Sequence, residues 1–356
     1  MGARRAAIVT PHFTDHDAVC NDVFHSALAL RRRGWEAAIF AMGGDSTREA
    51  ARPIAELGSF LRAPDDLLYF HFSHGQKALT DAVAAARCRK VLKTHNVTPP
   101  EFFSMWSDEL AEASRLGRED MARVARMGWE RVIGASGYNL AEFAPYLPAD
   151  TPRVVIPPFH ETDAMLEHAR PGTPASPARL LTVGRIAQNK GHPFLLRVVR
   201  YLVHELRTPV VLDVVGKPDH RLLAYLRTLE LMVREFGLEA HVSFRGGMDV
   251  AGLARCYAEA SVFLMASEHE GFCVPLAEAM AFGLPIVALG TSAIPETVGD
   301  AGIVWKERDA RRFAVAIQRL LQNPAERTWL ADQGRKRFAA HFDNRILEQR
   351  LAEAIG

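Results

Sequence analysis

The sequence has little that would support a disulfide framework, a metal cluster or a membrane span. Its 356 residues include four scattered cysteines, Cys20, Cys88, Cys256 and Cys273, without metal-ligand spacing. We therefore expect reduced thiols and neither a disulfide nor a zinc site. No apolar run is long enough to cross a bilayer, and the first residues lack the apolar core of a signal peptide. These absences predict a cytoplasmic protein.

The sequence also lacks an excess of charge of either sign. It has 43 basic and 42 acidic residues, and its net charge of +1 gives no overall attraction to nucleic acid. A helix predicted over residues 108–127 carries Arg115, Arg118, Arg123 and Arg126 among acidic residues. Two interpretations of this helix are open. It is a solvated face, or it makes a peripheral contact with an anionic membrane at its inner face.

Apolar runs of strand length alternate with helical patterns along most of the chain. The predicted strands are residues 6–10, 35–40, 67–72, 90–94, 131–134, 180–184, 210–215, 242–246, 261–266 and 285–289. The clearest predicted helices are residues 21–33, 76–87, 108–127 and 193–206. Strands that alternate with helices predict an α/β fold with mostly parallel sheets and right-handed crossovers.

A change of character near the middle divides the chain. Residues 158–178 are rich in proline and show little periodicity, so we interpret them as a linker. The predicted domains are residues 1–157 and 179–340, and a last helix occupies residues 341–356. Each domain is large enough to bury its own core. Open α/β sheets bind ligands at the carboxyl ends of their strands, so two such domains predict a ligand cleft.

The most informative segment lies between the predicted strand at 261–266 and the next one at 285–289. It contains Glu270, then Gly271-Phe272-Cys273, then a helix that begins near Pro275 and includes Glu278. The amides of Gly271, Phe272 and Cys273 should point out of the helix N-terminus, which favours an anion. Two carboxylates beside an anion site suit a ligand with phosphates and hydroxyls, such as a nucleotide sugar. The alternative is two solvated glutamates beside an ordinary turn.

A second polar segment follows the first strand of the second half. Gly184 ends that strand and Arg185 follows it, and Lys190 precedes Gly191 and a helix that starts near Pro193. Arginine binds phosphate oxygens in a bidentate manner, and lysine acts as a compact point charge. Both cations would stabilise negative charge on a diphosphate. The alternative is a solvated loop with two ordinary basic residues.

The two segments together resemble the Glu-x7-Glu and Gly-Arg-x4-Lys-Gly motifs of the family-4 retaining glycosyltransferases of the GT-B fold. The resemblance implies two Rossmann-like domains facing across a cleft, with the nucleotide-diphosphate sugar in the C-terminal domain. It implies that Glu270 contacts the donor sugar, that Glu278 holds the ribose hydroxyls, and that Arg185 and Lys190 stabilise the leaving diphosphate. Gly216, at the next strand end, resembles a loop residue beside the nucleotide base. The same resemblance implies no metal and no other cofactor.

The N-terminal half resembles polysaccharide-building members of that family. The matching segments are residues 17–22, 69–75 and 93–103. His95 matches a strand-end histidine that faces the donor sugar, although a lone strand-end histidine is often structural. His71 and His74 are weaker candidates. Many members have a Gly-Gly pair in the first strand-to-helix loop. Here residues 10–18 contain no glycine, and Asp17 is expected to cap the following helix.

The resemblance predicts a retaining transfer of a sugar to a glycan, a lipid-linked acceptor or a small molecule. No protein nucleophile or general base is assigned, since the family transfers by a front-face route in which a donor phosphate oxygen takes the acceptor proton. A glycoside phosphorylase or a sucrose- or trehalose-type synthase is an alternative on the same fold. A catalytically silent sugar-nucleotide-binding subunit is a further alternative from a different class.

Overall fold

The structure is a computed structural model that describes residues 4–15, 17–169 and 176–356. The chain forms two compact units. Unit 1 comprises the described residues of Met1–Pro100, Leu110–His160 and Asn344–Gly356, and unit 2 comprises those of Glu101–Glu109 and Glu161–Asp343. Residues 170–175, in the predicted linker, and His16, in the glycine-free loop, lie outside the described residues. Within that linker segment the structure places a helix, α6 (Thr162–His168).

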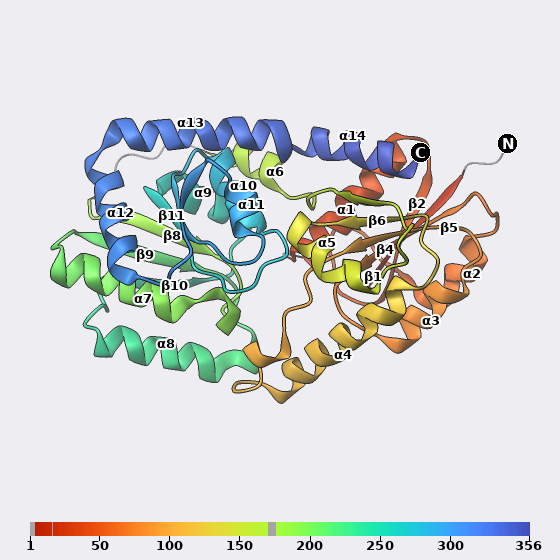
Figure 1. Ribbon diagram of the computed structural model, residues 1–356, viewed down its shortest axis with the longest axis horizontal. Coiled ribbons are helices and arrows are strands. Elements are labelled where there is room, and N and C mark those ends of the chain that lie inside the picture. The colour runs from red at the N-terminus through yellow and green to blue at the C-terminus, as the bar shows by residue number, and fades with distance from the viewer. Residues whose placement is uncertain (1–3, 16, 170–175) are drawn as a thin grey trace. The chain divides into compact units, whose positions relative to one another are not determined.

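Unit 1 is built on a seven-stranded sheet in the order β3-β2-β1-β4-β5-β6-β7 (Figure 1). All its strand pairs are parallel. The strands are β1 (Arg5–His12), β2 (Glu36–Gly43), β3 (Arg52–Pro53), β4 (Leu67–Phe72), β5 (Arg89–Thr94), β6 (Arg131–Gly134) and β7 (Arg153–Val155). The helices are α1 (Ala18–Arg32), α2 (Leu57–Phe60), α3 (Lys77–Ala85), α4 (Asp108–Ala125), α5 (Gly137–Phe143) and α14 (Asn344–Ile355).

Alternating side chains of the unit 1 strands enter two separate cores, because successive residues of a strand point to opposite faces. Ile8 and Tyr69 pack with α1 and α14, whereas Val9 and Phe70 pack with α2, α3, α4 and α5. The sheet is therefore buried on both faces, which explains why its strands are almost continuously apolar. The last helix, α14, is fixed to this unit by buried Leu347 and Leu351 and by an Arg32–Glu348 ion pair of 2.5 Å.

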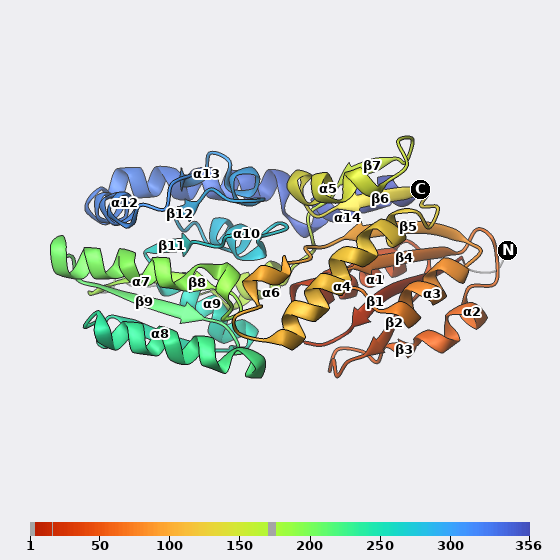
Figure 2. The same cartoon turned by 60° about the horizontal axis from the view of Figure 1, so that its bottom comes forward.

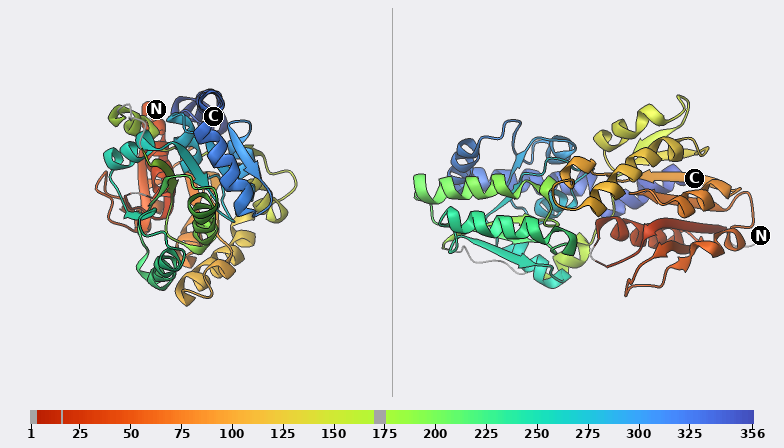
Figure 3. Two further views of the ribbon diagram at one scale, coloured as in Figure 1. Left: turned by 90° about the vertical axis from the view of Figure 1, so that its left-hand side faces the viewer. Right: turned by 90° about the horizontal axis from the view of Figure 1, so that it is seen from below.

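Unit 2 is built on a six-stranded parallel sheet in the order β10-β9-β8-β11-β12-β13 (Figure 2). The strands are β8 (Ala178–Val183), β9 (Val210–Val215), β10 (Val242–Gly246), β11 (Val262–Met265), β12 (Ile286–Leu289) and β13 (Gly302–Trp305). The helices besides α6 are α7 (His192–Arg200), α8 (Leu223–Glu235), α9 (Val250–Glu259), α10 (Val274–Ala281), α11 (Ile294–Val298), α12 (Ala310–Gln322) and α13 (Pro324–His341). A π-helical segment, Tyr201–Glu205, prolongs α7. Helices α7 and α8 lie side by side (the green helices in Figure 3, right).

All of the predicted strands are present, and the predicted α/β class with two parallel sheets is confirmed. The sequence analysis missed β3, β7 and β13, which are edge strands of only two to four residues. The four cysteines are free thiols, as expected. In the described chain, the longest helices are too polar to cross a membrane.

The arginines of α4 are largely paired with acidic side chains. Arg115 contacts Glu112 and Glu119, Arg118 contacts Glu142, and Arg123 contacts Asp81. Charges that are neutralised by neighbours attract an anionic surface weakly. These contacts favour the interpretation of α4 as a solvated face.

Candidate active site

The loop between β11 and α10 has the geometry of an anion site. Cys273 precedes α10 and adopts a left-handed backbone conformation with φ of 77°. Among the described residues, the amides of Gly271, Phe272 and Cys273 donate to no protein acceptor. The Phe272 carbonyl accepts a hydrogen bond of 2.7 Å from the Thr297 hydroxyl, which fixes the loop. The predicted loop before a helix is thus present, with its N–H groups available to a ligand.

Glu270 and Lys190 come together at the ends of two neighbouring strands. Lys190 Nζ lies 2.5 Å from Glu270 Oε1, and the two side chains are 20% and 9% exposed. The loops that carry them are joined, since the Glu268 amide donates to the Asn189 carbonyl at 2.7 Å. A Cβ on Gly184 would lie 3.5 Å from Lys190 Cε, so the lysine side chain runs along this glycine. The sequence predicted these residues separately, and the structure makes them one site.

Glu278 projects from α10 into a buried position. The Tyr257 hydroxyl donates to its Oε2 at 2.6 Å. Burial raises the pKa of Glu278 to about 7. The tyrosine fixes one oxygen of the carboxyl group, which leaves Oε1 for a second hydrogen bond. The sequence analysis did not identify Tyr257, because helical spacing makes it look like a core aromatic.

Arg185 and Gly216 surround the same strand ends. Arg185 is exposed, makes no ion pair among the described residues, and lies 5.9 Å from the Phe103 ring centroid. A Cβ on Gly216 would come within 1.9 Å of the Gly184 carbonyl oxygen, so the loop after β9 packs directly on the loop after β8. Only glycine permits this close approach. Arg185 thus has a guanidinium available to a ligand beside Lys190.

Residues 101–109 also belong to this unit, although they follow the unit 1 strand β5 in the sequence. The indole N–H of Trp106 donates to Gln188 Oε1, and its ring lies 5.2 Å from that of Tyr225. Phe102 lies 6.2 Å from the ring of His269, the neighbour of Glu270. The segment therefore packs against both loops that carry the polar site. Sequence order alone gave no signal for this arrangement.

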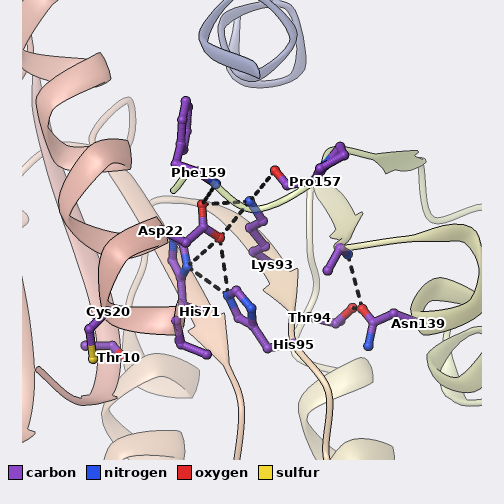
Figure 4. A network of polar contacts seen from close by, with 12 residues as sticks. Thr10, Cys20, Asp22, His71, Lys93, Thr94, His95, Asn139, Pro157 and Phe159 are labelled. Atoms are coloured by element: carbon purple, nitrogen blue, oxygen red, sulfur yellow. Dashed lines mark hydrogen bonds and ion pairs between the residues drawn. The ribbon is translucent and has the colours of Figure 1, made fainter. Parts of the chain in front are cut away.

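In unit 1, His95 lies directly after β5 in a buried polar cluster with Asp22, His71 and Lys93 (Figure 4). Its Nε2 is 3.1 Å from His71 Nδ1, and the two rings are stacked. Asp22 Oδ2 lies 3.6 Å from His71 Nδ1 and 3.5 Å from His95 Nε2. Burial and the nearby Lys93 charge hold the pKa of both histidines well below its usual range. Both rings are therefore neutral at pH 7.

Lys93 is the cation of this cluster. Its Nζ lies 2.9 Å from Asp22 Oδ1 and 2.7 Å from Oδ2, and it also donates to the Pro157 carbonyl at 3.3 Å. The Phe159 amide donates to Asp22 Oδ1 at 2.9 Å. Burial raises the pKa of Asp22 and lowers that of Lys93, while their contact opposes both changes. Asp22 and Lys93 lie in segments that the sequence analysis matched to the family, but it gave neither residue a role.

Two other N-terminal predictions concern the loop before α1 and the remaining histidine. Asp17 caps α1, as predicted, by accepting from the amides of Val19 and Cys20. Asp15 accepts from the hydroxyls of Ser46 and Thr47, each at 2.6 Å, so it anchors the loop to a neighbouring turn. His74 stacks on His12 with ring centroids 5.4 Å apart.

One group of described residues has the composition of a metal site. The facing atoms of Asp22, His71 and His95 lie close enough together to hold an ion. The sequence analysis expected no metal anywhere in the chain. The ammonium of Lys93 already holds the carboxylate of this group, so the cluster has its own cation.

The similarity to known proteins agrees with the architecture. Residues 165–337 match the family model described as "Glycosyl transferases group 1". The chain is 32% identical over 250 residues to a D-inositol 3-phosphate glycosyltransferase of Nocardioides sp., an alignment that covers 63% of this chain and 54% of the relative. The chain thus spans about half the length of the curated relatives it matches first.

Solved structures resemble the chain over nearly its whole length. A sucrose-phosphate synthase of Thermosynechococcus elongatus has a TM-score of 0.75 at 20% identity, with 98% of each chain covered. The Anabaena protein Alr3699/HepE, crystallised with UDP, has a TM-score of 0.74 at 17% identity, again with 98% of each chain covered. The chain therefore has the fold of the GT-B glycosyltransferases, and residues 165–337 carry the sequence pattern of glycosyl transferases group 1.

Proposed function

We propose that this chain is a retaining glycosyltransferase that moves a sugar from a nucleotide-diphosphate donor to a sugar-containing acceptor. The observation that carries the proposal is the convergence of Lys190, Glu270 and the unpaired loop amides in unit 2. The lysine and the loop amides suit the phosphate oxygens of a ligand, and the carboxylate suits its sugar hydroxyls. The Glycosyl transferases group 1 match over residues 165–337 supports this assignment.

The donor half of the reaction is assigned to residues of unit 2. Lys190 has three N–H donors and uses one on Glu270, so two are free for diphosphate oxygens. Arg185 adds a second cation. These charges and the loop amides stabilise the charge that grows on the diphosphate as the bond to the anomeric carbon breaks. Glu270 accepts from a donor-sugar hydroxyl, and Glu278, held by Tyr257, accepts from the ribose.

The transfer itself is proposed to follow a front-face route. The bond between the anomeric carbon and the diphosphate breaks, and a bond from that carbon to the acceptor oxygen forms on the same face. The acceptor proton passes to a diphosphate oxygen, so atoms and charges balance without a protein base. His95, in unit 1, would hydrogen-bond the sugar. Lys190 and Arg185 supply the positive charge that a metal ion supplies in other transferases.

The relatives suggest which compounds to test first. One solved relative binds UDP, and several curated relatives act on D-inositol 3-phosphate. We propose UDP-sugars as the first donors, with phosphorylated polyols and glycosides as the first acceptors. Calorimetry with UDP, GDP, ADP and dTDP would identify the base, because one diphosphate should bind much more tightly than the others.

Proton NMR of the product, formed with excess EDTA, tests the mechanism. Retention at the anomeric carbon is expected, with activity kept in EDTA. An inverted product, or complete loss of activity in EDTA, would contradict the proposal. Sugar 1-phosphate formed from a glycoside and free phosphate would instead identify a phosphorylase. Tight diphosphate binding without any turnover across acceptors would identify a binding subunit.

A further inference from the structure

The buried cluster of unit 1 places a full ion pair beside two histidines. Asp22 comes from α1, His71 from β4, Lys93 from β5, and His95 follows β5. Asp22, His71 and Lys93 are fully buried, and His95 is 7% exposed (Figure 4). A buried ion pair is costly unless its hydrogen bonds are well satisfied, and it often contributes little net stability. Its presence at a strand end, in a unit that already has two apolar cores, therefore suggests a task beyond packing.

The geometry of the three facing ligand atoms resembles that of a tetrahedral metal site. Their separations are 3.1, 3.5 and 3.6 Å. Ligands about 2.0–2.1 Å from a zinc ion would be separated by similar distances. However, the Lys93 ammonium contacts both oxygens of Asp22, at 2.9 and 2.7 Å. The carboxylate therefore already has a cation, and an added ion would be repelled by the ammonium.

The hydrogen bond between the histidines determines which nitrogen of His95 carries a proton. Two neutral rings share one proton across the 3.1 Å contact between His71 Nδ1 and His95 Nε2. His71 Nε2 is buried without a hydrogen-bond partner. If it carried the proton, an N–H would be orphaned, which folded proteins rarely tolerate. The proton therefore belongs on His71 Nδ1, which donates to His95 Nε2 and lies beside the Asp22 carboxylate.

The second nitrogen of His95 is then the one that faces outward. With Nε2 occupied as an acceptor, a neutral His95 carries its proton on Nδ1. Nδ1 makes no hydrogen bond within the described residues and is not among their enclosed, unpartnered atoms. It is therefore the accessible polar atom of the cluster. Its N–H is a donor of fixed direction at the carboxyl end of β5.

We propose that Asp22, Lys93 and His71 are positioning residues that hold His95 as the neutral Nδ1–H tautomer, so that it donates to a hydroxyl oxygen of the transferred sugar. The catalytic part of this inference rests on the proposed function. The positive charge of Lys93 neutralises the Asp22 carboxylate. Without this neutralisation, one of the histidine rings would take up a proton. Other groups that face the cluster are His25 of α1, which interacts with Asp22, and Tyr69 of β4, whose ring lies 4.5 Å from His71.

Nitrogen-15 NMR of the full chain with labelled histidine tests the tautomer without any substrate. Both His71 and His95 should show Nδ1–H signals that stay unchanged as pH falls from 8 to 5.5. A dominant Nε2–H signal for His95 would overturn the proposal, and so would titration of either ring near pH 6.5. Binding of Co²⁺ to the wild-type cluster, seen by its visible absorption, would also overturn it, because Lys93 would then not be the cation.

Two variants test the roles of Lys93 and Asp22. Lys93→Met leaves the Asp22 carboxylate unbalanced, so a ring of the histidine pair should take a proton and titrate within the measured pH range. The matched Asp22→Asn/Lys93→Met variant removes both charges and should restore neutral rings. If Lys93→Met does not fold, the double variant alone still tests whether the rings stay neutral once both charges are absent. Rings that titrate in the double variant would contradict the assigned balance of charges.

A third variant connects the tautomer to transfer. His71→Leu removes the ring that donates to His95 Nε2 and offers no N–H in its place, so the Nδ1–H signal of His95 should lose its dominance. The expected fall in kcat is about 10- to 100-fold, by analogy with the loss of partners that orient metal-bound histidines. The Kd for the nucleoside diphosphate should not change. A lost Nδ1–H signal with wild-type kcat would refute the positioning role, whereas an inactive wild-type chain with the expected NMR signals would refute only the proposed function.

Discussion

The two polar sites of this chain differ in how their charges are balanced. In unit 1, Lys93 and Asp22 are fully buried, and each oxygen of the carboxylate contacts the ammonium. In unit 2, Lys190 and Glu270 share one contact, the Lys190 side chain is 20% exposed while Glu270 is buried, and the nearby loop amides have no acceptor among the described residues. The ion pair of the first site is complete by itself. The second has free donors, so a ligand can complete it.

This difference shows that the same pair of residue types can serve two purposes. A lysine–carboxylate pair closed by the protein sets the protonation of its neighbours. A lysine–carboxylate pair that keeps N–H donors unused beside it can bind a ligand with those donors. Substitution of the lysine should therefore mainly lower stability in the first site and mainly weaken donor binding in the second.

The largest expected effect is on the stability of unit 1. Lys93→Met should lower the free energy of unfolding by about 3–5 kcal/mol, because it leaves a buried carboxylate without its cation. Asp22→Asn/Lys93→Met should cost much less, since removing both charges is often close to neutral. Lys190→Met should cost less than Lys93→Met, because the Lys190 side chain is 20% exposed and unused loop amides lie near Glu270. Urea unfolding of the three variants checks the order, and equal losses for Lys93→Met and Lys190→Met would erase the contrast.

The second effect is on catalysis and belongs to unit 2. Lys190→Met should lower kcat by about 10²- to 10³-fold, the scale for losing one donor to a developing negative charge. Binding of the nucleoside diphosphate should also weaken, while the unfolding free energy should fall less than it does in Lys93→Met. Single-turnover kinetics with the preferred donor gives the rate. A Lys190→Met enzyme with normal turnover would remove the lysine from the proposed mechanism.

A smaller effect separates the two glutamates of unit 2. Glu278→Gln should mainly raise KM for the donor, because ribose is bound alike in the ground and transition states. Glu270→Gln should mainly lower kcat, since the proposed mechanism places Glu270 against the reacting sugar. Steady-state kinetics of both variants decides the matter. Tyr257→Phe is a matched control that should raise the donor KM as Glu278→Gln does, but by less. The division of roles would be contradicted if both glutamate variants changed kcat and KM in the same way.

The smallest effect is a difference in how the two units respond to acid. In unit 1, burial lowers the pKa of His71, His74 and His95, so the unfolded chain binds more protons than the fold below pH 6.5. The stability that these neutral histidines contribute to unit 1 is therefore lost as pH falls. The raised pKa of Asp22 has the opposite effect, because it favours the folded state as pH falls. Unit 1 should therefore be the more acid-sensitive unit.

In unit 2 two shifts act against each other. Burial lowers the pKa of His192 to about 4, which costs stability as pH falls below 6.5. Burial also raises the pKa of Glu278 to about 7, so the fold binds more protons than the unfolded chain and gains stability as pH falls from 7 to 4.5. Hydrogen exchange at pH 7 and pH 5, corrected for intrinsic rates, should show a larger loss of protection in β1, β4 and β5 than in β8 and β11. The reverse order would refute this assignment.

Local patterns made the strands, the main helices and the positions of Glu270 and Glu278 around a loop predictable from the sequence. Glu270 and Glu278 were found because a strand, a turn and a proline-started helix are all encoded within a few neighbouring residues. The partners were not found, because Tyr257 and Lys93 act on residues far away in the chain. The role of such a hydroxyl or lysine depends on the residues that the fold places beside it. Asp22 and Lys93, for example, are in contact although they are 71 positions apart in the sequence. His95 was matched by its motif, but its neighbour His71 became meaningful only through their contact.

The position of residues 101–109 has a consequence for exchanging halves between related transferases. The chain passes from one unit to the other at residues 100, 109, 160 and 343, so neither unit is a single stretch of sequence. A chimera joined at one point near residue 178 would replace Phe103 and Trp106 while it kept their neighbours Arg185 and Gln188. The graft would then combine one parent's residues 101–109 with the other parent's Arg185 and Gln188. A well-matched hybrid should instead carry residues 101–109 and 161–343 from one parent, and take the last helix from the parent that supplies unit 1.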